Sequence, residues 1–230
     1  SDDDGNLSVE KEAAILEILP LAMAVHNSGG KVIAQVEQIK STGEIKPKNV
    51  IVPGYLVDYV VLSRDSETDH RQSCKYIYEP SLAGNKSNNQ SKIIVNAPTN
   101  KIERKIIAKR AIEELTDGDI INLGQGIPTD IIPLLQKNSN LNNVHFTLES
   151  GVSGGVPMAV PDFGISHKPE AMIRPDDMFM LFNGGGLDVS FLGFAQIDRF
   201  GNVNVSKFGN NFVGCGGFID IAQNTKKIIF

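Results

Sequence analysis

Apolar residues recur at helical spacing in three stretches of the chain. Residues 8–27 predict a first helix, with Ser8 placed to cap its amino end and Pro20 expected to kink it. Residues 101–115 predict a second helix that ends at an Asp-Gly pair. Residues 128–136 predict a third, which begins with proline at an early helical position.

Short apolar runs bounded by turn residues predict strands. Residues 192–197 and 203–205 flank a turn at residues 198–202, and together they predict a hairpin. The remaining strands are predicted over residues 31–36, 49–52, 59–62, 119–123, 144–148, 178–182 and 227–230.

Helices that alternate with buried strands predict an α/β protein with an open parallel sheet. A polar stretch rich in Gly, Asn, Ser and Lys interrupts this pattern. We interpret residues 63–100 as a surface connection between two compact parts. The chain then divides into residues 1–62, the connection 63–100 and residues 101–230.

A turn near the start of the chain is repeated near its end. Asp2-x-x-Gly5-Asn6-Leu7 matches Asp198-x-x-Gly201-Asn202-Val203, and a Gly-Gly pair leading to an apolar run follows each copy. A duplicated domain whose first copy lacks its front would produce this echo. Because the chain also stops inside a predicted strand, we expect it to be the middle of a longer protein.

Two glycine-broken turns follow buried strands. The first is Gly124-Gln125-Gly126-Ile127-Pro128, and the second, Gly151-Val152-Ser153-Gly154-Gly155, follows Glu149. Ligands of open α/β sheets bind where strands end. Glycines let backbone N–H groups approach a ligand, and a carboxylate beside such donors suits covalent attack on an activated acyl group. We therefore place the candidate chemistry at Glu149.

The residues alone leave other roles open. Gly124-Gln125-Gly126 lacks the third glycine and the acidic residue of a dinucleotide fingerprint, and the Lys-Ser/Thr pair of a P-loop. It can be a plain strand-to-helix turn, or a backbone-amide cradle for an acyl or phosphate-bearing ligand, which we prefer. Glu149 can also be a hydrogen-bonded structural group.

Two further glycine clusters, Gly184-Gly185-Gly186 and Gly214-Cys215-Gly216-Gly217, can each be simple turns. All four clusters stand near the end of an apolar run. We therefore expect them to gather as loops on one edge of a sheet. Asp188 and Asp220 are expected to cap turns.

Composition narrows the function further. The 230 residues are 41% hydrophobic and 21% charged, as in ordinary globular proteins, and their net charge of -5 argues against nucleic acid as the main partner. No apolar stretch is long enough to span a bilayer, so we expect no membrane partner. Cys74, Cys215 and the four histidines show no metal-ligand spacing. We expect no metal site and a reducing compartment.

As a set, these stretches resemble the family I CoA-transferases, and among them the single-chain acetate/propionate (short-chain acyl) type. The resemblance covers nearly the whole chain except residues 63–100. It rests on the stretches Ala24-Val25-His26-Asn27-Ser28-Gly29-Gly30, Val52-Pro53-Gly54-Tyr55-Leu56-Val57-Asp58, Asn122-Leu123-Gly124-Gln125-Gly126-Ile127-Pro128, Glu149-Ser150-Gly151 with Gly154-Gly155, Gly184-Gly185-Gly186-Leu187-Asp188 and Gly214-Cys215-Gly216-Gly217-Phe218-Ile219-Asp220.

The resemblance implies a role for each motif. Glu149 matches the catalytic glutamate, which attacks an acyl-CoA to give an acyl-glutamyl anhydride and then a glutamyl-CoA thioester. Gly216 and Gly217 match the glycine whose backbone forms the oxyanion hole. The residues expected to bind the substrate are Gly124, Gln125, Gly126, Gly151, Gly154, Gly155, Gly184, Gly185 and Gly186.

The resemblance also implies the rest of the protein. Two related open α/β domains would face each other across the site, and this chain would hold the end of the first and most of the second. The whole protein would be a homo-oligomer in the cytoplasm or an organellar matrix. CoA or acyl-CoA would be its substrate, with no permanently bound cofactor. This part alone would be inactive.

The implied activity is transfer of CoA between a short-chain acyl-CoA and a free carboxylate such as acetate or propionate. Val152-Ser153 stand where relatives usually carry Pro then Ile, and Gln125 replaces a more usual apolar residue. Both departures bear on the preferred acyl size. Two alternatives remain on the same fold: a non-catalytic module that binds an effector, and a sugar-phosphate isomerase.

Overall fold

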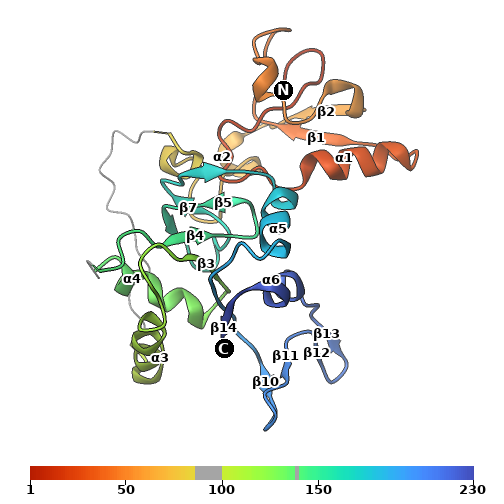
Figure 1. The fold of residues 1–230 in the computed structure, drawn as a ribbon. Coiled ribbons are helices and arrows are strands. Elements are labelled where there is room, and N and C mark those ends of the chain that lie inside the picture. Colours follow the sequence, from red (N-terminus) through yellow and green to blue (C-terminus); the bar gives the residue numbers. More distant parts are fainter. Residues whose placement is uncertain (86–99, 138–139) are drawn as a thin grey trace.

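The computed structural model describes residues 1–85, 100–137 and 140–230. Figure 1 shows a small unit at the N-terminal end and a larger part with a central sheet between helices. Short hairpins near the C-terminus project from the end of the molecule opposite the small unit.

The larger part is organised around a six-stranded sheet in the order β14-β9-β3-β4-β5-β8. The first four of these strands run parallel, and β5 and β8 are added antiparallel at one edge. Parallel strands are usually buried on both faces, and β9 is buried at every position. The strands are β3 (Ile120–Leu123), β4 (His145–Thr147), β5 (Val152–Ser153), β8 (Ala171–Met172), β9 (Val189–Phe191) and β14 (Lys227–Ile229).

Helices cover both faces of this sheet. Ile121 and Leu123 pack on one face in a core shared with the first helical layer. Met178 and Ile221 belong to the core of the other face. The first layer is formed by α3 (Ile102–Ile112), η4 (Ile127–Ile131) and α4 (Ile132–Leu135), and the second by α5 (Pro175–Asn183) and α6 (Phe218–Asn224). The α/β prediction is confirmed, as are the strands predicted over residues 119–123, 144–148 and 227–230.

A row of buried polar side chains crosses the middle of the sheet. Thr147, Asn122 and Ser190 stand in register on β4, β3 and β9. The Thr147 hydroxyl donates to the Ile121 carbonyl at 2.9 Å, and the Asn122 amide donates to the Thr147 carbonyl at 3.2 Å. Buried polar groups normally find such partners, but the Asn122 Oδ1 atom has none in the described part of the chain.

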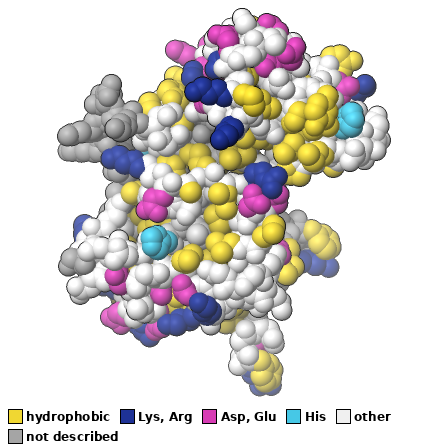
Figure 2. All heavy atoms as spheres, turned by 45° about the horizontal axis from the view of Figure 1, so that its top comes forward, with side chains coloured by type: hydrophobic (Ala, Val, Ile, Leu, Met, Phe, Trp, Pro, Cys, Tyr) yellow, Lys and Arg dark blue, Asp and Glu magenta, His cyan; other side chains and the backbone are white. Residues whose placement is uncertain are grey.

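The N-terminal unit pairs two short parallel strands beside one helix. These are α1 (Ile18–Asn27), β1 (Ile33–Val36) and β2 (Tyr59–Leu62), with the turns η1 (Pro47–Asn49) and η2 (Gly54–Leu56) between the strands. Figure 2 shows apolar side chains spread over the surface of this unit. The exposed ones include Leu21, Met23, Ile33, Tyr59, Val61 and Leu62.

The polar connection contains packed structure in its described part. It holds α2 (Ser66–Asp69) and η3 (Pro80–Ala83). Leu82 is fully buried against Ala13 and Met158, so this part ties the N-terminal unit to the larger one. The interpretation of residues 63–100 as a surface connection is therefore wrong for residues 80–83, and residues 86–99 lie outside the described residues.

The predicted helix over residues 8–27 is only half formed. The helix starts at Ile18, after Leu16 with a positive φ of 57°. Pro20 therefore lies in the first turn, where backbone N–H groups have no partner within the helix. The predicted kink is wrong for this reason.

Two predicted strands are also wrong. Residues 49–52 carry the end of η1, and Val52 forms only an isolated bridge with Leu7. Residues 178–182 lie inside α5, which begins with proline and has Asp176 and Asp177 in its first turn. Met178 and Phe182 are four residues apart, so a helix buries both on one side.

The predicted hairpin is confirmed with shorter strands, β10 (Gln196–Ile197) and β11 (Val203–Asn204), which pair antiparallel, whereas residues 192–195 form no strand. The other short pairs are β6 (Val156–Pro157) with β7 (Ser166–His167) and β12 (Lys207–Phe208) with β13 (Asn211–Phe212). Within the described residues, no helix is long and apolar enough to cross a membrane.

The repeated turn has the same internal hydrogen bonds in both copies. Asn6 donates to the Asp2 carboxylate through its backbone N–H at 2.9 Å and through its side chain at 3.0 Å. Asn202 donates to the Asp198 carboxylate in the same way, at 2.9 and 2.8 Å. A helix and then a strand follow each copy: α1 and β1 after the first, α6 and β14 after the second. The sequence echo thus corresponds to a repeated structural unit.

Candidate active site

Glu149 lies just beyond the carboxyl end of β4, after the buried Leu148. The neighbouring parallel strand β3 ends beside it, and the chain then turns at Gly124, whose N–H donates to the Phe191 carbonyl at 2.7 Å. A Cβ atom at Gly124 would lie 2.9 Å from that carbonyl oxygen. The glycine therefore allows the ends of β3 and β9 to lie against each other next to Glu149.

The turn after Glu149 is fixed by its backbone. The Gly151 N–H donates to the Leu148 carbonyl at 3.0 Å, and Gly151 has a positive φ of 89°. Its added Cβ would lie 1.9 Å from the Ile173 carbonyl oxygen. The Ser150 hydroxyl donates to the Gly164 carbonyl. Gly151 thus serves the tight packing that holds Glu149 in place.

Gly154 and Gly155 serve packing as well. Both have positive φ angles, 71° and 70°. A Cβ atom at Gly154 would overlap the Glu170 side chain, and one at Gly155 would lie 2.3 Å from the His167 carbonyl oxygen. Neither glycine lines the cavity next to Glu149.

Gly217 is the glycine that faces the candidate nucleophile. A Cβ atom there would lie 3.3 Å from the Glu149 Cγ atom and 2.9 Å from the Phe179 ring. Gly216, with a positive φ of 54°, faces open space. Within the described part of the chain, the N–H groups of these two glycines donate to no protein acceptor. The structure therefore brings one of the two predicted oxyanion glycines, Gly217, next to the predicted nucleophile, whereas no contact places Gly216 there.

The Glu149 carboxyl group is in an unusual electrostatic setting. Burial raises its pKa above the ordinary value for glutamate, whereas its own backbone N–H and the Asn122 side-chain amide act in the opposite direction. No lysine, arginine or histidine of the described residues forms a salt bridge with it. A carboxylate that is poorly hydrated and unpaired is a stronger nucleophile than one in water.

A cavity of about 850 Å³ opens next to Glu149. Its walls come from α3, from the turn after β3 with Gly124 and Gln125, from the end of β9, and from the segment leading into α6 with Cys215 and Gly217. Glu149 is the only charged residue among the described residues that line it. Gly126 does not line it, and its carbonyl accepts hydrogen bonds from Thr129 and Arg104.

Gly184, Gly185 and Gly186 lie away from this cavity. They end α5, and their N–H groups donate to the carbonyls of Met180, Phe182 and Leu181. They precede β9, so they lie at the amino end of a strand whose carboxyl end borders the cavity. The expectation that four glycine clusters share one sheet edge is therefore wrong for this cluster. This error follows from the wrong prediction of a strand over residues 178–182, which are part of α5.

Two features of the site were missed at the sequence level. Asn122 is fully buried within an apolar run, and a polar residue at such a position was the available signal. The cavity also holds many aromatic rings, which come from segments far apart in the sequence. They are Phe163, Phe191, Phe194, Phe208, Phe218 and Phe230.

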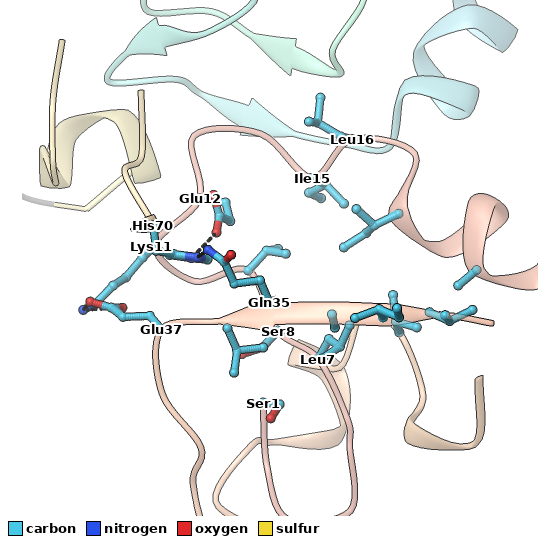
Figure 3. Close-up of a pocket in the computed structure, with 18 of the residues that line it drawn as sticks. Ser1, Leu7, Ser8, Lys11, Glu12, Ile15, Leu16, Gln35, Glu37 and His70 are labelled. Carbon is cyan, nitrogen blue, oxygen red and sulfur yellow. Dashed lines mark hydrogen bonds and ion pairs between the residues drawn. The ribbon is translucent and has the colours of Figure 1, made fainter. Parts of the chain in front are cut away.

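A second cavity of about 760 Å³ lies in the N-terminal unit, against α1 and β1 (Figure 3). Some of the charged side chains around it form ion pairs. Lys11 contacts Glu37 at 2.8 Å, and His70 contacts Glu12 at 3.3 Å. The described residues contain no cluster of three or more His, Cys, Asp or Glu that could hold a metal ion.

Comparison with known proteins identifies the class of protein to which this fold and site belong. The Coenzyme A transferase family matches residues 1–63 and 104–230, and the chain therefore belongs to this family. It is 44% identical over 235 residues to caffeate CoA-transferase of Acetobacterium woodii, covering 100% of this chain and 44% of that protein. It is 37% identical over 232 residues to acetate CoA-transferase YdiF of Escherichia coli O157:H7, covering 100% and 42%.

Solved structures of the same family also match this chain over its whole length. The apoenzyme of the YdiF acyl-CoA transferase from Escherichia coli O157:H7 matches with a TM-score of 0.84 and 34% identity, over 100% of this chain and 41% of that chain. The thioester complex of the same protein with CoA matches with a TM-score of 0.83. The chain thus spans less than half the length of these relatives.

Proposed function

We propose that this chain forms the part of a CoA-transferase that carries the nucleophile. The observation that supports this most is the position of Glu149, unpaired and half-buried, at an open cavity beside Gly217. The complete enzyme would exchange CoA between an acyl-CoA and a free carboxylate. Its covalent intermediate would be a thioester between Glu149 and CoA.

The proposed reaction has four steps of the same kind. A Glu149 carboxylate oxygen attacks the thioester carbonyl carbon, the C–S bond breaks, and an acyl-glutamyl anhydride and CoA thiolate result. The thiolate attacks the glutamyl carbonyl and releases the first carboxylate, which leaves Glu149 as the CoA thioester. An incoming carboxylate attacks this thioester, and the thiolate then attacks the acyl carbonyl of the new anhydride. Free Glu149 and the new acyl-CoA result, and no proton is transferred overall.

The surroundings of Glu149 suit these steps. Each attack creates an oxyanion that needs hydrogen-bond donors, and we assign the free N–H groups of Gly216 and Gly217 to this role. A further donor, a polar side chain, would come from the rest of the longer protein. CoA enters as a substrate, and the proposed chemistry uses no bound cofactor or metal.

We propose that this chain acts as part of a longer protein. The β1–β2 sheet is parallel, and parallel sheets are usually covered on both faces, yet apolar side chains of this unit are exposed. The remainder of that longer protein would cover this surface and complete the site. The two-domain division, a homo-oligomeric state, a cytoplasmic or organellar location and inactivity of this part alone belong to the same proposal.

The acids that exchange CoA are also part of the proposal. Two relatives are named for acids as different as caffeate and acetate, so membership in the family does not fix them. Acetate and propionate are the small acids to test first. The isomerase alternative is disfavoured, because a sugar phosphate needs cations and the described residues lining the cavity include none.

A trapping experiment tests the proposed function. The complete protein is incubated with acetyl-CoA, treated with borohydride, and digested for peptide mass mapping. We expect Glu149 to be reduced to the corresponding alcohol, because borohydride reduces a glutamyl thioester but not a carboxylate. CoA binding without modification of Glu149 would instead favour the non-catalytic binding module, and modification of another residue would overturn the assignment.

A further inference from the structure

We infer that Phe179 is a positioning residue for the proposed reaction, because its ring fixes Gly217 and Glu149 relative to each other. This inference rests on the proposed function, since it explains how the same site keeps its nucleophile and its oxyanion donor together. It depends on three observations: the contacts at Gly217, the packing of the Phe179 ring, and the conformational freedom of the glycine segment.

The Phe179 ring and the Glu149 side chain share the space next to Gly217. A Cβ atom at Gly217 would lie 2.9 Å from Phe179 Cζ, 3.2 Å from Phe179 Cε1 and 3.3 Å from Glu149 Cγ. All three distances are shorter than the usual separation of carbon atoms in contact, about 3.5–4.0 Å. The ring and the glutamate side chain therefore both lie on the face of the glycine where any other residue would carry its side chain.

The ring is held in place by the core around it. Phe179 lies on α5 and meets the fully buried Phe182 edge to face, with ring centroids 5.6 Å apart and planes at 75°. It also packs against the core cluster that contains Met178 and Ile221. Side chains in close-packed cores occupy defined rotamers. The tip of the ring, which faces Gly217, therefore has a fixed position.

The segment over residues 214–217 is held by hydrogen bonds at its two ends. The Gly214 N–H donates to the Ser206 carbonyl at 3.1 Å, and the Gly217 carbonyl accepts from the Ile221 N–H at 3.0 Å. Gly214 and Gly216 are exposed, and an added Cβ atom at either would meet nothing within 4 Å. Glycines permit more backbone conformations than other residues. The contact with Phe179 limits this freedom at the residue that faces Glu149.

Phe179 acts on the reaction through these two neighbours. It is not among the described residues that line the cavity next to Glu149, so we expect it to contact no substrate. The proposed steps need the Glu149 carboxyl group and the Gly217 N–H at a set separation. Without the tip of the ring, a gap beside both lets either one move, and a displacement of about 1 Å can cost about 100-fold in rate. The loss should therefore appear in the chemical step and not in binding.

A substitution on α5 tests the role of the ring. Phe179→Leu removes the Cε and Cζ atoms that face Gly217 and keeps an apolar side chain. In the complete protein, the rate of Glu149 modification by acetyl-CoA is followed by rapid quenching with borohydride at increasing acetyl-CoA concentration. We expect the rate at saturation to fall about tenfold, less than for removal of an oxyanion donor, and the half-saturating concentration to change less than about twofold.

Phe182→Leu is the matched control on the same helix. It removes the same atoms from a ring that is fully buried and is not among the atoms nearest to Gly217. We expect it to lower the Tm at least as much as Phe179→Leu, because Phe179 is only partly buried. The saturating rate should change less than about twofold. Stability and rate should thus be affected in opposite order by the two variants.

A double-mutant cycle with Gly217→Ala tests the contact itself. The added methyl group would meet the ring tip of Phe179 in the unaltered protein, whereas Phe179→Leu makes room for it. We therefore expect Gly217→Ala to reduce the saturating rate at least about fivefold less in the Phe179→Leu background than in the unaltered protein. A ring that only stabilises the fold would give losses that multiply.

The outcomes separate this inference from the proposed function. An unchanged saturating rate in Phe179→Leu, equal losses of rate in Phe179→Leu and Phe182→Leu, or losses that multiply in the cycle would overturn the role of Phe179 and leave the proposed function intact. Absence of modified Glu149 in the unaltered protein would overturn the proposed function, and the inference with it.

Discussion

The two cavities of this protein lie at equivalent places in a repeated unit, and they differ in charge. Val9, Ala22 and Ile33 line the first cavity. At the interval that separates Asp2 from Asp198, their counterparts Val205, Phe218 and Ile229 line the second. The same turn, helix and strand thus form one wall of each.

The carboxylates beside the two cavities have different partners. In the first cavity Glu37 lies 2.8 Å from the Lys11 ammonium, Glu12 lies 3.3 Å from the His70 imidazole, and Glu10 accepts a hydrogen bond from Ser8. In the second, Glu149 has no cationic partner among the described residues and its pKa is raised by burial. The difference teaches that the shared scaffold provides the space in both copies, whereas the reactivity that we propose would come from a carboxylate that the described residues leave without a counter-charge.

The largest expected difference between the two cavities is the effect on kcat of removing one carboxylate from each. We expect Glu149→Ala to lower kcat in the complete protein by on the order of 10⁴-fold or more, because the nucleophile is lost, while CoA still binds. The matched change in the other cavity, Glu12→Ala, should alter kcat by less than about twofold. Both are measured by acyl-CoA exchange and by CoA titration. Near-normal turnover in Glu149→Ala would contradict the covalent role.

Asn122 offers a smaller and more selective test. Its amide lowers the pKa of Glu149, against the larger effect of burial. In Asn122→Leu we therefore expect that pKa to rise, so the acid limb of kcat/KM should move to higher pH. At a fixed pH on that limb, kcat/KM should fall about fivefold, as for a lost hydrogen bond to a charged group.

The pH profile distinguishes positioning from packing. A purely structural role for Asn122 would lower kcat/KM equally at every pH. In that case the profile would keep its shape, and the proposed effect of Asn122 on the Glu149 pKa would be wrong. Ser190→Ala, in the same buried row but without an effect on the Glu149 pKa, is the control.

The contact between the two parts of the molecule should respond to pH. His167 is 3% exposed, its Nδ1 lies 2.9 Å from the Ser81 hydroxyl of η3, and burial lowers its pKa. The unfolded chain therefore binds a proton near the ordinary value of about 6.5, and the folded chain only at lower pH. The contribution of neutral His167 to the free energy of unfolding should be fully present above about pH 6.5. Below that pH it should decrease by at most about 1.4 kcal/mol per pH unit.

Urea midpoints across this pH range measure the effect. His167→Gln should flatten the decline between pH 6.5 and 5, whereas His145→Gln, at a half-exposed position on β4, should leave it in place. The same decline in both variants would show that another group is responsible.

The smallest expected difference concerns the two copies of the turn. Asp2 is 3% exposed, whereas Asp198 is exposed, although their hydrogen bonds are the same. An uncompensated buried N–H costs more than one in contact with water. We therefore expect Asp2→Ala to lower the Tm by a few degrees and Asp198→Ala by less. An equal loss in both would mean that burial does not distinguish the copies.

Much of the fold could be predicted from the sequence. The central strands are short β-branched runs followed by glycine turns, and the pattern of residues 119–123 and 144–148 fits little else. Because the second of these strands was predicted to end at residue 148, the position of Glu149 at a strand end could be predicted as well. The repeated turn could be found because aspartate, glycine and asparagine each have a definite role in it.

The errors have physical reasons. Residues 178–182 are apolar throughout, and a short run without alternation fits a buried strand and a buried helix equally well. Because of this error, Gly184, Gly185 and Gly186 were predicted at the carboxyl edge of the sheet, whereas they lie at the amino end of β9. The aromatic lining of the cavity could not be predicted, since Phe163, Phe194 and Phe230 come to the same cavity only through tertiary folding.

Gly217 has a consequence for the descent of such proteins. A side chain at this position would press on Phe179 and on the Glu149 side chain together. A mutation that replaces Gly217 by alanine adds a single methyl group, and we expect it to lower the proposed transferase activity although every charged residue is unchanged. In comparisons between related genomes, copies that keep the glutamate but have lost this glycine are therefore expected to have lower activity than copies that keep both.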